Sequence, residues 1–206
     1  MKFLSTTEHH KSWWRNRKID WKKDYLATYN HPHRLWMIEQ IQPLGFSSLF
    51  EIGCGPGANL AALGVVFPRL ALGGADINEE AIALARKTFP PTSLFEVASG
   101  DNLMMSDQSC DIVMTDMTLI YVGGNKIKDY LREMVRVARR YVVISEFYHP
   151  SWWKRIKMTL AGRYTHNYPQ LLEDLGCSDI MVRKMPSRLW PGAHDEEYRY
   201  LVMARV

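Results

Sequence analysis

The stretch Leu49-Phe50-Glu51-Ile52-Gly53-Cys54-Gly55-Pro56-Gly57 decides the fold. It begins in a short apolar run, Ser48–Ile52, whose composition is typical of a buried strand. A turn with three glycines follows, and Asn59–Phe67 then has the pattern of a helix that Pro68 ends. Because glycine adopts positive φ angles and leaves room where a side chain would stand, the turn predicts a ligand at the carboxyl end of this strand.

Strand and helix signals alternate beyond this turn. The expected strands are Leu70–Ala75, Ser93–Ala98, Asp111–Met114 and Tyr141–Ser145, and the expected helices are Glu79–Phe89 and Lys126–Arg140. This alternation predicts a parallel sheet with helices on both faces. After Pro150 the pattern changes to helices over Ser151–Leu160 and Pro169–Leu175, then to strands over Ile180–Met185 and Tyr198–Val206, which we expect to pair antiparallel at the sheet edge.

Composition places the chain among ordinary globular proteins. Its 206 residues are 47% hydrophobic and 23% charged, which excludes disordered, collagen-like and coiled-coil classes. Three widely spaced cysteines, Cys54, Cys110 and Cys177, predict neither a disulfide framework nor a zinc site, so a reducing, cytoplasmic location is expected. No segment approaches the roughly 18 apolar residues of a membrane span, and residues 1–7 lack the apolar region of a signal peptide.

Charge and tryptophan are unevenly distributed along the chain. The net charge is +4, but residues 1–36 alone carry eight basic and three acidic residues. All seven tryptophans lie before residue 37 or after residue 150. The sequence therefore consists of a nearly neutral middle between basic, aromatic flanks.

Acidic residues near the turn indicate what it binds. Glu51 stands two residues before the first glycine, where it would oppose a pyrophosphate but suit an ammonium or sulfonium group. Asp76 lies 19 residues after Gly57 at the end of the second strand, the spacing of an acid that accepts hydrogen bonds from ribose hydroxyls. Ser99-Gly100-Asp101-Asn102 follows the third strand, where a polar side chain can reach an adenine amino group.

These motifs, in this order, resemble the class I S-adenosylmethionine-dependent methyltransferases, and most closely the small type 11 branch. The resemblance covers residues 46–148 and includes Asp111–Asp116 on the fourth strand. It implies an α/β, Rossmann-like, doubly wound seven-stranded sheet, mostly parallel with an antiparallel C-terminal hairpin. It also implies a single domain over residues 1–206, with an N-terminal helical flank (1–45), a cofactor-binding core (46–148) and an acceptor-side region (149–206).

The resemblance further implies a cofactor, S-adenosylmethionine, with S-adenosylhomocysteine as product. Gly53, Gly55 and Gly57 would cradle its methionine part, and Cys54 fills the tight space within the turn. The remaining expected cofactor contacts are Glu51 at the positive end, Asp76 at the ribose, Ile77 and Asp101 at the adenine, Asn102 lining that pocket, and Asp116 and Met117 facing the methyl donor and the acceptor. The stretch Asp116-Met117-Thr118-Leu119 lacks the Pro-Pro-aromatic motif of many nucleobase methyltransferases, so that subclass is not expected.

Catalytic groups must come from loops at the carboxyl ends of the strands. Methyl transfer is an in-line displacement in which the protein mainly orients the reactants, and a general base helps when the acceptor is a hydroxyl or a protonated amine. His149, past the fifth strand, is the expected base, although a turn before Pro150 would explain it equally well. Glu146 would orient it, replace it or cap a helix, and Asp116 completes the catalytic set.

Acceptor contacts are expected from loops and flanks: Asp116–Tyr121, Tyr164–Tyr168, His31–Arg34 and Trp190–His194. Within these segments, His33, Arg34, Tyr121, Tyr164 and His166 are the candidate binding residues. Arg34 or His33 would alternatively reach the cofactor carboxylate, and a surface turn around Pro32 is the competing interpretation of both. The tyrosines would equally well pack with only their hydroxyls exposed.

The functional hypothesis is methyl transfer to a small polar acceptor, such as the hydroxyl or amine of a sugar, metabolite or natural product. Three alternatives stay open. They are an RNA methyltransferase using the basic flanks, an NAD-dependent oxidoreductase matching Gly53-x-Gly55-x-x-Ala58, and a non-catalytic scaffold or membrane-surface adaptor using Trp152-Trp153-Lys154-Arg155. No metal is expected, because Asp116 alone does not make a metal site. The oligomeric state is left open between monomer and homodimer.

Overall fold

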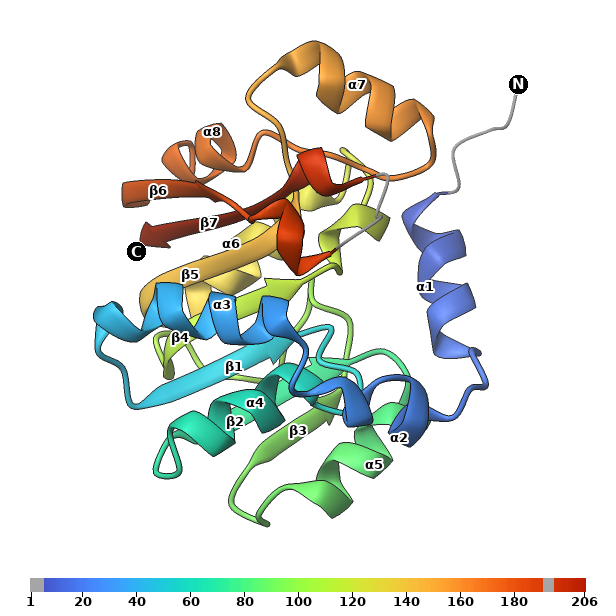
Figure 1. The fold of residues 1–206 in the computed structure, drawn as a ribbon, viewed down its shortest axis with the longest axis vertical. Coiled ribbons are helices and arrows are strands. Elements are labelled where there is room, and N and C mark those ends of the chain that lie inside the picture. Colours follow the sequence, from blue (N-terminus) through green and yellow to red (C-terminus); the bar gives the residue numbers. More distant parts are fainter. Residues whose placement is uncertain (1–5, 191–194) are drawn as a thin grey trace.

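A single seven-stranded sheet organises the computed structural model, which describes residues 6–190 and 195–206 (Figure 1). Its strands are β1 (Ser48–Ile52), β2 (Ala71–Asp76), β3 (Leu94–Val97), β4 (Cys110–Asp116), β5 (Ala138–Phe147), β6 (Ser178–Lys184) and β7 (Arg199–Arg205). They lie in the order β3-β2-β1-β4-β5-β7-β6, and β7 is antiparallel to both of its neighbours. The predicted α/β fold with a reversed C-terminal hairpin is confirmed.

Helices cover both faces of this sheet (Figure 1). The helices are α1 (Thr7–Arg15), α2 (Trp21–Asp24), α3 (Pro32–Ile41), α4 (Ala58–Val66), α5 (Glu79–Thr88), α6 (Ile127–Val137), α7 (Trp152–Leu160) and α8 (Tyr168–Glu173). The buried residues of α3, α4 and α5 join one hydrophobic cluster, and those of α6 and α8 join another. Strand residues alternate between the two clusters, so Leu49 packs with the first and Phe50 with the second, as the two-residue period of a strand requires.

The chain order places the glycine turn at the centre of one sheet edge. From β1 the chain runs to β2 and β3 on one side, then crosses to β4 on the other. The loop after β1 therefore lies at the topological switch point, where neighbouring loops diverge and leave room for a ligand.

Helix and strand boundaries mostly follow the sequence expectations, with one correction. The helix expected over Lys126–Arg140 ends at Val137, because the chain from Ala138 onward already pairs with β4. Arg139 contributes to this ending, since its guanidinium pairs with Asp111 of β4 at 2.9 Å. β4 and β5 are both longer than expected, which extends the two central strands toward the cavity described below.

Two further sequence expectations concern the chain as a whole. Cys54, Cys110 and Cys177 are free and buried. Within residues 6–190 and 195–206, no helix has the length and apolarity needed to cross a bilayer.

Candidate functional site

A cavity of about 400 Å³ lies at the carboxyl ends of β1, β2 and β4. Its volume is within the range of about 300 to 1,000 Å³ that is common for small-molecule sites. Two walls enclose it. We call the lining residues between positions 51 and 147 the core wall, and those before position 35 or after position 162 the flank wall.

The glycine turn forms the floor of the core wall. Gly53, Gly55 and Gly57 have φ angles of +73°, +53° and +91°, which other residues rarely adopt. A Cβ at Gly53 would overlap the Thr118 side chain, and one at Gly57 would come within 2.6 Å of the Phe89 ring. A Cβ at Gly55 would meet only Trp21, at 3.9 Å, so the turn is open there. Gly53, Cys54 and Gly55 line the cavity, whereas Gly57 leads into α4 outside the lining.

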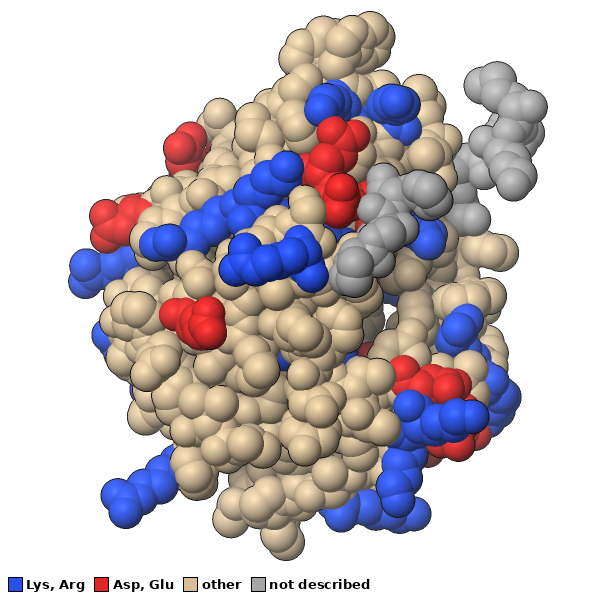
Figure 2. All heavy atoms as spheres, viewed as in Figure 1, with Lys and Arg blue, Asp and Glu red and all other residues tan. Residues whose placement is uncertain are grey.

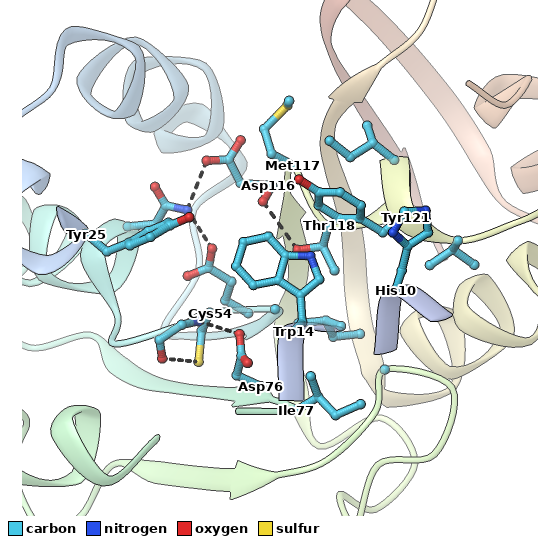
Figure 3. A pocket seen from close by; sticks show the side chains of 18 of the residues that line it. His10, Trp14, Tyr25, Cys54, Asp76, Ile77, Asp116, Met117, Thr118 and Tyr121 are labelled. Carbon is cyan, nitrogen blue, oxygen red and sulfur yellow. Dashed lines mark hydrogen bonds between the residues drawn. The ribbon is translucent and has the colours of Figure 1, made fainter. Parts of the chain in front are cut away.

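Asp76 fixes the shape of this turn from the end of β2. Its Oδ2 accepts a hydrogen bond from the Gly55 N–H at 2.8 Å, and its Oδ1 accepts one from the Asn78 N–H at 2.8 Å. Burial raises the pKa of Asp76, although these two hydrogen bonds act to lower it. Asp76 and Ile77 both line the cavity, as Figure 3 shows. Each carboxylate oxygen can accept a second hydrogen bond, so Asp76 still has capacity for a ligand hydroxyl.

Asn59 joins two acids at the centre of the cavity. Its Nδ2 donates to Glu51 Oε1 at 2.5 Å and to Asp116 Oδ2 at 3.2 Å. Asp116 Oδ1 also accepts a hydrogen bond from Ser145 Oγ at 2.8 Å. The three side chains come from β1, the first turn of α4 and the end of β4, so the sheet itself brings them together.

The two acids differ in charge. Burial, reinforced by the nearby Asp116 carboxylate, raises the pKa of Glu51 to about 8 despite the hydrogen bond from Asn59. Burial would raise the pKa of Asp116 as well, but His33, Arg34 and the Ser145 hydroxyl outweigh it and lower that pKa to about 2. At neutral pH Glu51 therefore carries a proton and Asp116 carries a negative charge.

His33 and Arg34 approach Asp116 from the start of α3. His33 Nε2 lies 3.3 Å from Asp116 Oδ2, and the Arg34 guanidinium donates to the same His33 nitrogen at 2.7 Å. Arg34 also donates to Thr28 Oγ1 at 3.1 Å. Arg34 is only 8% exposed, and within residues 6–190 and 195–206 it has no ion pair with an acid. The cavity thus contains a buried guanidinium without a carboxylate partner.

One face of α1 forms much of the flank wall. Thr7, His10, Lys11 and Trp14 recur at the three- and four-residue spacing of a single helical face, and all four line the cavity. The Trp14 indole reaches into the cavity in Figure 3 and packs edge-on against Tyr121. Trp21 and Tyr25 continue this aromatic wall on one side, and Trp190 lies against the His33 ring at 4.9 Å.

Three contacts hold α1 against the core. The Thr7 hydroxyl accepts from the Gly123 N–H at 2.8 Å, and Lys11 pairs with Asp101 at 2.9 Å. The Asn78 side chain donates to the backbone oxygen of Trp14 at 2.9 Å, while its own oxygen caps α5 by accepting from the Ala81 N–H. α1 is therefore attached at its beginning, middle and end.

Unpaired polar atoms concentrate at this cavity. Nine buried side-chain atoms have no hydrogen-bond partner among the described residues, and six of them belong to residues that line the cavity. Two are side-chain oxygens, Glu51 Oε2 and Asn59 Oδ1, and four are N–H donors from Trp14, Trp21, Arg34 and Trp190. Buried polar groups usually have partners, so this concentration indicates a ligand that offers both donors and acceptors.

Several expected site residues lie elsewhere. Asn102 is exposed, and both carboxylate oxygens of Asp101 accept from Lys11; neither residue lines the cavity. Tyr164 and His166 stack with their ring planes 13° apart outside the lining. The His166 ring contacts the Val122 carbonyl oxygen at 2.7 Å, and burial lowers its pKa to about 4.

The structure corrects the expected catalytic pair. His149 lies outside the cavity lining, where its Nδ1 accepts from the Ser151 N–H at 3.0 Å, so it does not stand where a base is needed. Glu146 is buried and accepts from the backbone N–H groups of Thr118 and Leu119 at 2.7 and 2.8 Å. Of the roles expected for Glu146, these contacts fit the capping of a helix end. They shape the loop after β4, where Met117 adopts a φ of +54°. Residues 191–194, part of one expected acceptor segment, lie outside the described residues.

Sequence reasoning missed most of the flank wall. Trp14, Trp21, Tyr25 and Lys11 belong to no motif, and their only signal was the excess of tryptophan and basic residues before position 37. Asn59 had a usable signal, since it is the one polar residue in the otherwise apolar α4. Among the residues that the structure describes, no group of three or more His, Cys, Asp or Glu side chains is arranged to hold a metal ion.

Comparison with known proteins identifies the core. Residues 49–140 match a family described as a methyltransferase domain. No curated protein matches the sequence. The S-adenosylmethionine-dependent methyltransferase of Archaeoglobus fulgidus is similar in fold, with a TM-score of 0.59 at 16% identity over 88% of this chain and 98% of that one.

Two other similar structures contain a bound cofactor or product. Magnesium protoporphyrin IX methyltransferase from Synechocystis PCC 6803, with bound S-adenosylmethionine, has a TM-score of 0.67 at 14% identity, covering 100% of this chain and 99% of that one. Geranyl diphosphate C-methyltransferase from Streptomyces coelicolor A3(2), with Mg²⁺, geranyl diphosphate and S-adenosylhomocysteine, has a TM-score of 0.68 at 14% identity, covering 97% of each chain. At these identities the likeness is one of fold.

The matched region contains the glycine turn, Asp76 and the fourth strand, which are the motifs that carried the sequence resemblance. The finer placement in the type 11 branch stays a prediction. The family match and the shared fold agree: residues 49–140 match a methyltransferase domain, and the chain has the fold of S-adenosylmethionine-dependent methyltransferases.

Proposed function

We propose that this cavity binds S-adenosylmethionine and that the chain transfers its methyl group to a small acceptor held beside Asp116. The observation that carries the proposal is the set of unpaired buried atoms. Asn59 Oδ1 is an acceptor that suits an ammonium group, and Glu51 Oε2 becomes one when the cationic ligand favours the ionised carboxylate. The Arg34 Nε–H is a donor that suits a carboxylate. An α-amino acid end offers both groups at once.

The other end of the cavity suits a nucleoside. Asp76 retains acceptor capacity for ribose hydroxyls, and Ile77 offers an apolar surface to a base. Ala98, Ser99 and Gly100 line this end, whereas Asp101 is occupied by Lys11. We therefore assign the base contact to residues 98–100 and Ile77, and we assign to Asp101 the positioning of α1.

S-adenosylmethionine, when bound, supplies a methyl group activated by its sulfonium sulfur. The contribution of the chain is to orient this group and to exclude water, which the two walls do by enclosing the cavity. The negative Asp116 carboxylate would accept a hydrogen bond from an acceptor hydroxyl and hold its oxygen in line. His33, 3.3 Å from that carboxylate, replaces His149 as the proposed proton acceptor, since imidazole is the usual general base at neutral pH. Its Nε2 would give up the hydrogen bond from Arg34 when it takes the proton.

The acceptor end of the cavity combines apolar residues with the ion pair of Arg199 and Asp195, which also line it. Met117, Ile120, Phe147 and Trp190 line it, with Arg199 over the Trp190 ring at 4.2 Å. These walls support an acceptor that presents an apolar or aromatic surface beside the methylated atom. This narrows the expectation of a small polar acceptor to one with a substantial apolar part.

The basic flank gives less support to the RNA alternative than its composition suggested. Lys11 pairs with Asp101, Lys18 pairs with Glu80, and Arg34 is buried. The guanidinium of Arg17 lies over the Trp13 ring at 4.3 Å. Several of the flank cations therefore serve internal contacts and are poorly placed to neutralise phosphates.

Ligand titration tests this function directly. S-adenosylhomocysteine should raise the Tm and bind in calorimetry, whereas NAD should do neither. Asp76→Asn should weaken S-adenosylhomocysteine binding about tenfold, because an amide accepts ribose hydroxyls less well than a carboxylate. Asp107→Asn is the matched control, since Asp107 is exposed and outside the cavity lining. Stabilisation by NAD alone would overturn the proposal.

A further inference from the structure

α7 presents its apolar face to solvent. At 3.6 residues per turn, Trp152, Ile156 and Leu160 share one side of this helix, with Trp153 and Lys157 beside them. Trp152, Trp153 and Leu160 are 61%, 65% and 71% exposed. The opposite side, which includes Lys154, Arg155 and Met158, is half-buried against the protein. A surface helix normally has the reverse arrangement, so this face needs a partner.

The exposed face has the shape of a binding surface. Trp152 and Trp153 stack with their ring centroids 4.7 Å apart, so the two indoles form one compact aromatic pair. A hollow of about 350 Å³ lies beside it, lined by Trp152, Arg155, Ile156, Thr159, Leu160 and Thr165. In Figure 2 the top of the molecule, where Figure 1 places α7, is tan, and blue Lys and Arg atoms lie just below it.

Charge indicates what kind of partner this face fits. α7 contains three cations, Lys154, Arg155 and Lys157, and no acid. Arg155 donates to the backbone oxygens of His149 and Pro150 at 2.7 and 2.9 Å, which directs its charge along the base of the helix. Lys154 pairs with Glu197, whereas Lys157 has no ion pair among the described residues. Tryptophans beside the two cations that are not ion-paired among the described residues, Arg155 and Lys157, suit an interface whose outer layer is negative and whose inner layer is apolar.

We propose that α7 docks the protein on anionic membrane surfaces, lying in the interface with its tryptophan face immersed. Tryptophan and leucine on one side of a helix with lysine and arginine around them are the features of interfacial helices. α7 also packs through Met158 against the cluster of Ile120, Phe147 and Tyr198. Ile120 and Phe147 line the acceptor end of the cavity, so a membrane bound to α7 would lie on the acceptor side. This proposal is independent of the cofactor assignment.

Flotation with lipid vesicles tests the proposal. We expect the full chain to float with vesicles of phosphatidylcholine and phosphatidylserine, and about tenfold less with phosphatidylcholine alone. Leu160→Asp should lower binding to the anionic vesicles about tenfold, because it places a charge within the immersed face. Val65→Asp is the matched control: Val65 lies near the end of α4 and is 69% exposed, nearly the same as Leu160, but away from α7.

Further variants separate the apolar and charged contributions. Trp152→Ala with Trp153→Ala should reduce flotation as much as Leu160→Asp, and Lys157→Glu should reduce it only on anionic vesicles. Equal binding of Leu160→Asp and Val65→Asp would overturn the proposal, as would failure of the unaltered chain to float. Sedimentation velocity without lipid tests for a dimer. A dimer that Leu160→Asp dissociates would also contradict the proposal, because a second copy would then be the partner of this face.

Discussion

The core wall and the flank wall line the same cavity but are stabilised differently. The core wall stands on the ends of central strands, and its turn is fixed by neighbouring backbone groups, as in the hydrogen bonds from Gly55 and Asn78 to Asp76. In the flank wall, α1 is held to the core by a few side-chain contacts between residues far apart in sequence, such as Lys11 with Asp101. Regions with few such contacts open more readily, so ligands should enter from the flank side.

Gly53→Val, which disrupts the glycine turn of the core wall, should have the largest effect on ligand binding. Valine would be strained at a φ of +73° and would overlap Thr118. We expect about 100-fold weaker binding of S-adenosylhomocysteine and a lower Tm, measured by calorimetry and thermal melting. Gly124→Ala, where a Cβ would meet nothing within 4 Å, should change neither. Normal ligand binding by Gly53→Val would contradict the role of the turn.

Glu146→Ala should reduce stability more than binding. It would leave the buried N–H groups of Thr118 and Leu119 without an acceptor, at a cost of about 3 kcal/mol in the free energy of unfolding. Urea denaturation measures this loss. Glu146→Gln keeps an acceptor oxygen and should lose much less. If Glu146 were instead a catalytic base, both variants would lose activity equally and stability would stay unchanged.

Glu51→Gln should remove the pH dependence of stability and of ligand affinity that Glu51 causes in the core wall. Burial raises the pKa of Glu51 to about 8 in the free protein, so its protonated form contributes stability at low pH that is lost as pH rises from about 4.5 to 8. A cationic ligand favours the ionised form, so affinity for S-adenosylmethionine should rise about tenfold between pH 6 and pH 8.

Calorimetry across this pH range measures the slope of S-adenosylmethionine affinity against pH. Glu51→Gln should flatten it, because glutamine does not titrate. Glu146→Gln is the control and should leave the slope unchanged, since Glu146 does not line the cavity. A slope that persists in Glu51→Gln would assign the pH dependence to another group.

Trp14→Ala should weaken the flank wall while the fold persists. The indole reaches into the cavity, so its loss should weaken S-adenosylhomocysteine binding about fivefold with little change in Tm. Trp13→Ala is the control, because Trp13 is the neighbouring residue but is 47% exposed and does not line the cavity. Equal effects of the two variants would show that α1 contributes stability and no ligand contact.

Lys11→Ala should have the smallest effect of this series. The pair with Asp101 is partly exposed, so its loss should reduce stability by less than about 1 kcal/mol and ligand affinity about twofold. Hydrogen exchange in α1 measures the consequence more sensitively, since the middle contact of this helix would be gone. Unchanged exchange in α1 would remove Lys11 from the flank wall.

The difference between the walls also explains how far the sequence could be interpreted. The glycine turn, Asp76 and the capped helix α5 follow local rules of backbone conformation and spacing, so the alternation of strands and helices and the turn of the core wall were predictable. The position of α1 depends on Lys11, Thr7 and Asn78 meeting partners far along the chain, and no local pattern encodes such pairs.

His149 illustrates the same limit. Its distance from the fifth strand in sequence was right for a base, but the chain turns there and directs the ring toward Tyr198. His33, in contrast, is remote from the strand ends in sequence and reaches Asp116 only because α3 packs across the sheet. Catalytic position depends on such tertiary packing, which composition and spacing do not specify.

Hydrogen–deuterium exchange with and without S-adenosylhomocysteine tests the central claim, that both walls close on one cofactor. We predict that the ligand slows exchange in the core wall, at residues 53–57 and 76–78, and also in the flank wall, at residues 7–25. Protection confined to the core wall would contradict the account of a shared cavity. Protection in neither wall would contradict the proposed function itself.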